Sequence, residues 1–150
     1  MHLQIFFNSC AIDDTGVVCW GNNAFGQIDV PSLSNPSQVS TGTANSCALN
    51  DTGVICWGWN EYGQNNVPEL INPSQVSTGS GTNCAIDDTG VVCWGDDRDD
   101  RASPPSLSNV TNLGLGDAHS CAIASGSVTC WGSNAYSTVS GVPSLTNPVK

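Results

Sequence analysis

Four short segments of the chain carry apolar residues at nearly every position and are interrupted once by a polar turn sequence. The first, residues 10–20, reads CAIDDTGVVCW and returns unchanged at residues 84–94, with close variants at 47–57 and 121–131. Each interruption contains a glycine, such as Gly16, that tolerates the positive φ angle of a short hairpin loop. The pattern predicts four β-hairpins.

Both faces of each predicted hairpin are apolar. The register set by the turn places the two cysteines opposite each other, on one face with Ile12 and Val17, while the other face carries alanine, valine and tryptophan. A half-exposed strand would alternate apolar with polar residues, so we expect both faces to be covered, as in sheets stacked face to face. The tryptophans of the four Trp-Gly pairs should then lie in the core: Trp20, Trp57, Trp94 and Trp131.

The hairpins recur at a fixed step of 37 residues between the first cysteines of successive pairs. This period is typical of an array, solenoid or propeller whose repeats bury their faces against one another. No linker interrupts the repeats, so we predict one repeat domain, residues 1–150, either complete or an excerpt of a longer repeat protein. Its approximate units are 1–36, 37–73, 74–110 and 111–150.

The two ends of the chain share one phase of the repeat. This favours a closed four-blade ring over an open arc completed by another chain. Residues 3–7, LQIFF, are too apolar for an isolated wet edge, and we expect them to form a buried strand.

The eight cysteines form four pairs. Directly opposed positions of an antiparallel hairpin are close enough for a disulfide, which in the chain-entropy model contributes about 2–3 kcal/mol for a ten-residue loop. Free buried thiols and a zinc site are the alternatives, but the C-x₂₋₄-C steps of zinc sites are absent. Paired cysteines indicate an oxidising compartment, hence an extracellular, periplasmic or cell-surface location. The predicted pairs are Cys10–Cys19, Cys47–Cys56, Cys84–Cys93 and Cys121–Cys130.

The repeat resembles that of the regulator of chromosome condensation (alpha-tubulin suppressor-like) family in its bacterial, cysteine-containing form. Residues 116–123, GDAHSCAI, are similar to the first half of that repeat, and residues 53–64, GVICWGWNEYGQ, to its second half. The resemblance implies an all-β, β-propeller-like array of four 37-residue antiparallel blades, each a four-stranded sheet with a disulfide-stapled hairpin. The family's ring usually has seven longer blades, and its nucleotide exchange on a small GTPase depends on surface loops that have no match here.

Charge narrows the classes of partner. Thirteen acidic residues against three basic ones give a formal charge of −10. The chain lacks the lysine and arginine clusters that bind phosphate backbones or anionic membranes, and no stretch approaches the roughly 18 apolar residues of a membrane span. We expect no nucleic-acid partner and no membrane insertion.

No set of side chains signals catalysis. His2 and His119 have no serine or cysteine nucleophile in a recognisable setting. Residues 96–101, DDRDDR, offer four carboxylates to calcium, but Arg98 and Arg101 interrupt them, and we interpret the segment as a solvated acidic loop. We therefore predict a protein that is not an enzyme and has no cofactor or metal.

The loops that follow the Trp-Gly pairs differ most between units, so partner recognition is expected there. In a propeller these loops would gather at one end of the ring. Their aromatic and charged side chains suit a protein or a glycan, although phenylalanine and tyrosine could instead fill gaps between blades. The candidate binding residues are Phe25, Trp59, Tyr62, Arg98, Arg101 and Tyr136.

Two Asn-x-Thr sequences, at Asn50 and Asn109, are N-glycosylation acceptors if the producing cell has the machinery. Asn50 falls at a predicted hairpin tip and should be accessible.

Together these features favour an exported, non-catalytic binding or scaffold propeller that recognises a protein or glycan through its loops. The alternative is a structural building block of a surface fibre or adhesin, in which copies of the chain associate. An enzyme of unknown type is the remaining alternative.

Overall fold

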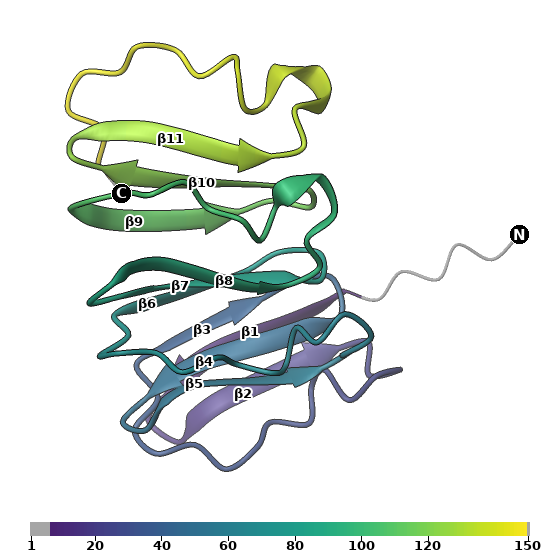
Figure 1. Ribbon diagram of the computed structural model, residues 1–150. Coiled ribbons are helices and arrows are strands. Elements are labelled where there is room, and N and C mark those ends of the chain that lie inside the picture. Colours follow the sequence, from purple (N-terminus) through teal and green to yellow (C-terminus); the bar gives the residue numbers. More distant parts are fainter. Residues whose placement is uncertain (1–6, 150) are drawn as a thin grey trace, which may run out of the picture.

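The computed structural model describes residues 7–149. This part of the chain is built from short strands, as the hairpin pattern predicts, and from two single-turn 3₁₀ helices that the pattern does not predict (Figure 1). The strands are β1 (Asn8–Asp13), β2 (Gly16–Gly21), β3 (Gln38–Thr41), β4 (Asn45–Asn50), β5 (Gly53–Gly58), β6 (Gln75–Thr78), β7 (Thr82–Asp87), β8 (Gly90–Gly95), β9 (Val110–Leu115), β10 (His119–Ala124) and β11 (Ser127–Gly132), and the 3₁₀ helices are η1 (Arg98–Asp100) and η2 (Ala135–Ser137).

Each 37-residue unit forms one antiparallel sheet, which we call a blade. The first blade is β1–β2, the second β3–β4–β5, the third β6–β7–β8 and the fourth β9–β10–β11. The complete blades therefore have three strands, and the four-stranded blade implied by the family resemblance is wrong for this chain. The segment between one blade and the next contributes apolar side chains such as Val67 and Leu70 but adds no strand.

The hairpin register is the predicted one. In the first blade Cys10 pairs with Cys19 and Ile12 with Val17, and the other three hairpins repeat this pairing. Gly16 at the turn has a φ of 121°. The four predicted disulfides are confirmed, with Cα atoms 4.0–4.1 Å apart.

Neighbouring blades stack through opposite faces. The disulfide face of the second blade, with Cys47 and Leu49, packs against the tryptophan face of the third, which contributes Val76, Ala85 and Trp94. The third blade packs on the fourth in the same way. Both faces of a middle blade are thus covered, which explains why its hairpin strands carry apolar residues on both faces (Figure 1).

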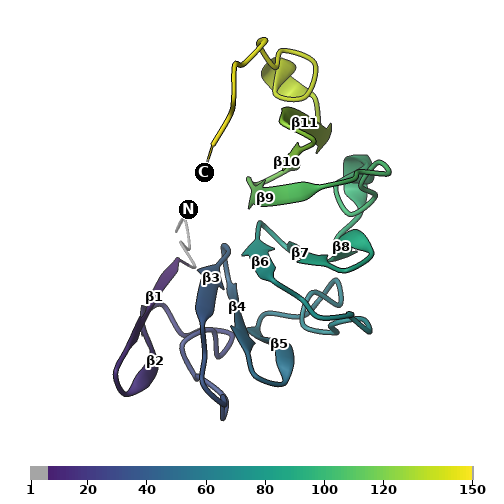
Figure 2. The same cartoon turned by 90° about the vertical axis from the view of Figure 1, so that its left-hand side faces the viewer.

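The blades fan out around a common axis, with β3, β6 and β9 towards the centre and β5, β8 and β11 outside (Figure 2). Near that axis the turns before β4 and β7 nearly touch. A Cβ atom on Gly42 would lie 2.2 Å from the carbonyl oxygen of Gly79, and one on Gly79 would lie 2.6 Å from that of Gly116. Only glycine permits this approach of one backbone to the next.

The fan is an open arc, because the first and fourth blades do not meet (Figure 2). The closed four-blade ring favoured by the sequence is therefore wrong. The two ends of the chain fall at the same position within the repeat, and each therefore lies at the equivalent place on its own blade. Whether the first and last blades touch depends instead on the rotation from one blade to the next. Of the expected buried strand at 3–7, residues 3–6 lie outside the described residues, while Phe7 is irregular and 65% exposed.

Neither 3₁₀ helix is long enough to cross a bilayer, and residues 7–149 contain no other helix.

Candidate protein-binding surface

The loop after each Trp-Gly pair reaches into the interface with the next blade. The backbone carbonyl of Gln27 accepts the indole N–H of Trp57 at 3.0 Å, and that of Gln64 accepts the indole N–H of Trp94 at 2.9 Å. Gln27 and Gln64 are completely buried, and the side-chain oxygen of Gln64 accepts the backbone N–H of Tyr62. The interior half of the loop is therefore fixed, and its outer half is presented on a rigid base.

The outer halves of the first two loops form a continuous aromatic surface. The rings of Phe25 and Trp59 lie 6.1 Å apart between centroids, and Trp59 meets Tyr62 edge-on at 5.1 Å. Phe25 and Tyr62 are 41% and 39% exposed, with Trp59 half-buried between them. Edge-on and tilted contacts are the arrangements that aromatic quadrupoles favour. These rings are thus both packed together and open to solvent.

The third loop extends this surface with a cation. The guanidinium carbon of Arg98 lies 5.0 Å from the centroid of Tyr62, within the range of a cation–π contact, and the side chain is 66% exposed. We call Phe25, Trp59, Tyr62 and Arg98 the aromatic–arginine row. It runs across three successive blades.

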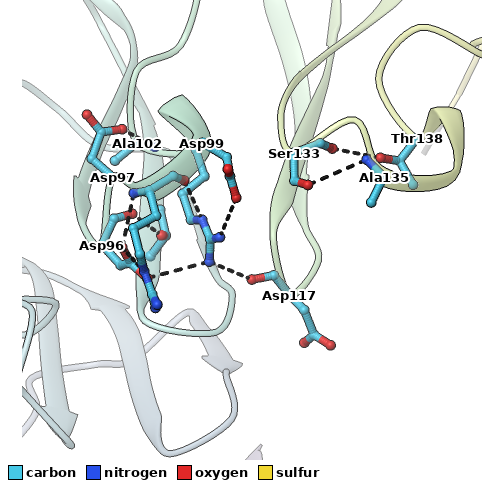
Figure 3. Close-up of polar contacts among 11 residues, drawn as sticks. Asp96, Asp97, Asp99, Ala102, Asp117, Ser133, Ala135 and Thr138 are labelled. Atoms are coloured by element: carbon cyan, nitrogen blue, oxygen red, sulfur yellow. Dashed lines mark hydrogen bonds and ion pairs between the residues drawn. The ribbon is translucent and has the colours of Figure 1, made fainter.

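The position of Arg98 is set by a buried carboxylate. Asp96 has a side chain only 3% exposed and accepts from the Nε of Arg98 at 2.9–3.0 Å and from Arg101 at 3.5 Å. Figure 3 shows Asp96, Asp97 and Asp99 gathered in this loop, with a contact reaching the backbone of Asp117.

The protonation of this pair follows from its geometry. The hydrogen-bonded guanidinium of Arg98 holds the pKa of Asp96 below its ordinary value, although burial opposes the shift, and the charge of Arg101 adds to it. The same contact raises the pKa of Arg98. Both groups are therefore charged at neutral pH.

Two predictions about the third loop need correction. Arg101 is only 9% exposed, and its carbonyl accepts the indole N–H of Trp131 at 3.1 Å, so it joins blades rather than offering a surface contact. It replaces the buried glutamine of the earlier loops. Asp96 is likewise buried, so the loop is not wholly solvated, because two guanidinium groups balance its charge.

The remaining carboxylates of this region are exposed. Exposed carboxylates lie in the same loops as Tyr62 and Arg98: Glu61 in the second loop, and Asp97, Asp99 and Asp100 in the third. Within residues 7–149 no cluster of three or more His, Cys, Asp or Glu side chains is arranged to hold a metal ion. The loops that carry the row are therefore acidic.

The fourth loop does not join the row. Tyr136 is fully exposed and makes no ring contact with the described aromatic residues. The sequence placed it with the others because it occupies the same repeat position. Among residues 7–149 the fourth blade is the last of the arc, and no loop of another blade follows that of Tyr136 (Figure 2).

The two glycosylation sequences differ in access. Asn50 is 8% exposed and its side-chain oxygen accepts from Thr52, so the expected accessible tip is wrong at this residue. Asn109 is exposed.

Sequence reasoning missed the two buried glutamines and their part in joining blades. The signal was present, since aromatic-Gly-Gln occurs at 25–27 and again at 62–64. Gly26 and Gly63 both have a φ of 75°, which shows that the triplet encodes a turn with its glutamine directed inward.

Comparison with known families agrees with this architecture. A family model described as the regulator of chromosome condensation (RCC1) repeat matches residues 37–64, which run from the start of the second blade to the buried glutamine of its loop. The other three units repeat the residue pattern of this matched segment. A comparison with curated protein sequences finds no significant match.

RCC1-like propellers are also among the solved structures that the chain resembles. The ectodomain of the Physcomitrella patens receptor kinase CR4 superposes with a TM-score of 0.67 at 25% identity, over 83% of this chain and 39% of that one. The CRINKLY WD40 ectodomain of the Arabidopsis thaliana receptor kinase ACR4 gives 0.66 at 25% identity, over 83% and 46%. Prp20p of Saccharomyces cerevisiae gives 0.72 at 15% identity, over 83% and 43%. The chain thus spans less than half the length of these structures.

Proposed function

We propose that this RCC1-like array is an exported, non-catalytic scaffold that binds a protein partner through the aromatic–arginine row. The observation that carries the proposal is the continuity of Phe25, Trp59, Tyr62 and Arg98 across three blades, with exposed rings and an exposed guanidinium. Aromatic and arginine side chains dominate the binding energy of protein interfaces. Buried Gln27 and Gln64 fix the backbones of Phe25 and Tyr62, and buried Asp96 holds the guanidinium of Arg98, so less freedom is lost on binding.

The charge around the row defines the partner's chemistry. Four exposed carboxylates lie in the loops that carry it, and the whole chain carries a formal charge of −10. A complementary surface would present one or two apolar side chains flanked by lysine or arginine. Such a partner would associate faster at low ionic strength, because the opposite charges steer the encounter.

Export is supported by the disulfides and by the relatives. Four bridges staple the four hairpins, and bridges of this kind persist in oxidising compartments. Two of the structures that the chain resembles are ectodomains of receptor kinases. Prp20 has the same fold and was studied for binding to Gsp1p and histones, which illustrates that such an array can present protein-binding surfaces.

A displayed peptide library screened on the immobilised oxidised protein tests the proposal. We expect enriched peptides that combine an apolar residue with basic ones. Trp59→Ala should weaken their binding by about tenfold or more. The matched control is Tyr136→Ala, which removes an aromatic ring of the same repeat position outside the row and should leave binding unchanged.

Two results would contradict the proposal. Binders that do not distinguish Trp59→Ala from the wild type would place recognition elsewhere on the array. A glycan array that shows binding dependent on Trp59, with no peptide selected, would assign the same row to a sugar ligand instead.

A further inference from the structure

Three side chains of the aromatic–arginine row carry N–H or O–H groups that the described part of the chain does not use. The indole N–H of Trp59 and the hydroxyl of Tyr62 have no hydrogen-bond partner within residues 7–149. Arg98 directs its Nε and Nη2 atoms to Asp96, and its Nη1 atom makes no hydrogen bond among the same residues. The row therefore presents unused donors among its rings.

The packing of the two rings leaves their donors on the outer side. A Cβ atom on Gly81 would lie 3.8 Å from Cζ3 of Trp59 and 3.3 Å from Cδ2 of Tyr62, so this glycine lies against both rings. Cζ3 is on the benzo edge of the indole, across the ring system from Nε1, and Cδ2 is at the end of the phenol ring remote from the hydroxyl. The Nε1 atom of Trp59 is not one of the buried unpartnered atoms of the described residues, and Tyr62 is 39% exposed. Both donors are therefore open to a ligand.

Arg98 adds a donor whose position is fixed. The buried carboxylate of Asp96 holds one edge of its guanidinium, at 2.9–3.0 Å from Nε (Figure 3), and the side chain is 66% exposed. The guanidinium carbon lies 5.0 Å from the centroid of Tyr62, and the Trp59 ring lies 5.1 Å from the same centroid. These distances keep all three donors within reach of one turn of a polyproline II helix, which advances about 9 Å.

Donors set among aromatic rings favour a ligand that offers carbonyl groups and apolar rings. Proline supplies both, because it has a backbone carbonyl but no N–H. A proline-rich segment forms a polyproline II helix without internal hydrogen bonds, so its carbonyls are free and its preformed shape loses little entropy on binding. An amphipathic α-helix uses its carbonyls internally and would cover the three donors without giving them acceptors, which is costly. An added β-strand needs the alternating donors and acceptors of a sheet edge, which these side chains do not offer.

We propose that the aromatic–arginine row binds a proline-rich segment of its partner in the polyproline II conformation. Proline rings would pack on Trp59 and Tyr62, and backbone carbonyls of the segment would accept from Trp59 Nε1, the Tyr62 hydroxyl and Arg98 Nη1. The exposed carboxylates of Glu61 and Asp97, in the same loops, would pair with a lysine or arginine beside the prolines. This inference rests on the proposed function, since it names the kind of peptide that the same row takes.

Isothermal titration calorimetry with two synthetic peptides tests the proposal. The first peptide has about twelve residues, or roughly four turns of polyproline II helix, with proline at most positions, leucine between the prolines and arginine at each end. The second replaces every proline by alanine and keeps the leucines and arginines. The first should bind the oxidised protein about tenfold or more tighter than the second, because alanine restores the backbone N–H groups and removes the preformed helix.

Variants that remove single donors test the individual contacts. Tyr62→Phe and Trp59→Phe keep an aromatic ring but lose the O–H or the N–H, and each should weaken binding of the proline-rich peptide by about fivefold or more, the loss of one hydrogen bond. Arg98→Lys keeps the charge beside Asp96 but has no second edge to donate from, and a similar loss is expected. Tyr136→Phe removes a hydroxyl outside the row and is the matched control, which should bind as the wild type does. Circular dichroism confirms that each variant is folded.

The outcomes separate this inference from the proposed function. Equal binding of the two peptides, binding of neither, or binding that Tyr62→Phe and Trp59→Phe leave unchanged would overturn the proline-rich ligand. So would a displayed library that yields peptides without proline whose binding depends on Trp59, and in that case the row would remain a protein-binding surface. A library that yields no peptide dependent on Trp59 would remove the proposed function and this inference together.

Discussion

Trp94 offers a direct measurement of what one blade joint contributes to stability. It is 8% exposed, and its indole N–H donates to the Gln64 carbonyl at 2.9 Å. Trp20 occupies the same repeat position but is 54% exposed. Replacing each by alanine compares a buried and an open copy of one side chain within one molecule.

The structure gives the expected difference between the stability losses of Trp94→Ala and Trp20→Ala. The exposed fractions of the two residues differ by 46 percentage points, 54% against 8%. An aromatic side chain buries about 200 Å² when fully covered, at about 25 cal/mol per Å², so this difference corresponds to about 2.3 kcal/mol. The lost hydrogen bond adds about 1 kcal/mol. Trp94→Ala should therefore lower the free energy of unfolding by about 3 kcal/mol more than Trp20→Ala, or lower Tm by roughly 6–12 °C more.

Urea unfolding followed by circular dichroism measures this difference. The oxidised protein is kept dilute so that association between copies does not contribute. Trp94→Phe separates the contribution of the buried area from that of the hydrogen bond, since phenylalanine retains most of the apolar area but has no N–H donor. Beyond the effect of its smaller area, this substitution should lower the free energy of unfolding by about 1 kcal/mol. If Trp94→Ala and Trp20→Ala lowered the free energy of unfolding equally, the claim that the buried indoles stabilise the contact between blades would be refuted.

Three further predictions concern a disulfide, the buried carboxylate of Asp96 and the two glycosylation sequences. Replacing Cys47 and Cys56 together by serine should lower the free energy of unfolding by about 2–3 kcal/mol in urea, since the bridge closes a ten-residue loop; an unchanged midpoint would contradict this. The folded-state pKa of Asp96 is lowered, so its contribution to stability is complete above its unfolded pKa of about 3.9 and is lost as pH falls through the folded value. Asp96→Asn should therefore reduce stability at neutral pH and flatten its fall below about pH 4, which thermal scans across pH would detect. In a glycosylating host, mass spectrometry should find glycan on Asn109 and not on buried Asn50, and the reverse occupancy would contradict the burial.

The sequence predicted the local structure of this chain well. Hairpin register, disulfide pairing and the two covered faces all follow from one eleven-residue pattern, because strand pairing and alternation are local properties. The 37-residue period then predicts stacked sheets. Three strands per blade, in place of the four implied by the resemblance, came only from the structure, in which the segments around Val67 and Leu70 contribute apolar side chains but make no ladder.

The arrangement between blades was harder to predict. Whether four blades close depends on the rotation between them, which no single repeat encodes. The burial of Arg101 also escaped the sequence, because an arginine in an acidic loop has the composition of a solvated face. It is buried because its backbone carbonyl takes the place held by glutamine in earlier loops. The expected gathering of the loops is seen for Phe25, Trp59 and Tyr62, whose rings contact one another, while their role in binding stays a prediction.

Hydrogen–deuterium exchange with and without a selected peptide partner tests the central claim most directly. The account predicts protection of backbone amides in the loops at 22–27, 59–64 and 96–101, which carry the aromatic–arginine row. The hairpin turns at 13–16, 50–53 and 87–90 lie at the opposite ends of the same strands and should exchange unchanged. Protection confined to those turns would contradict the assignment of the binding surface.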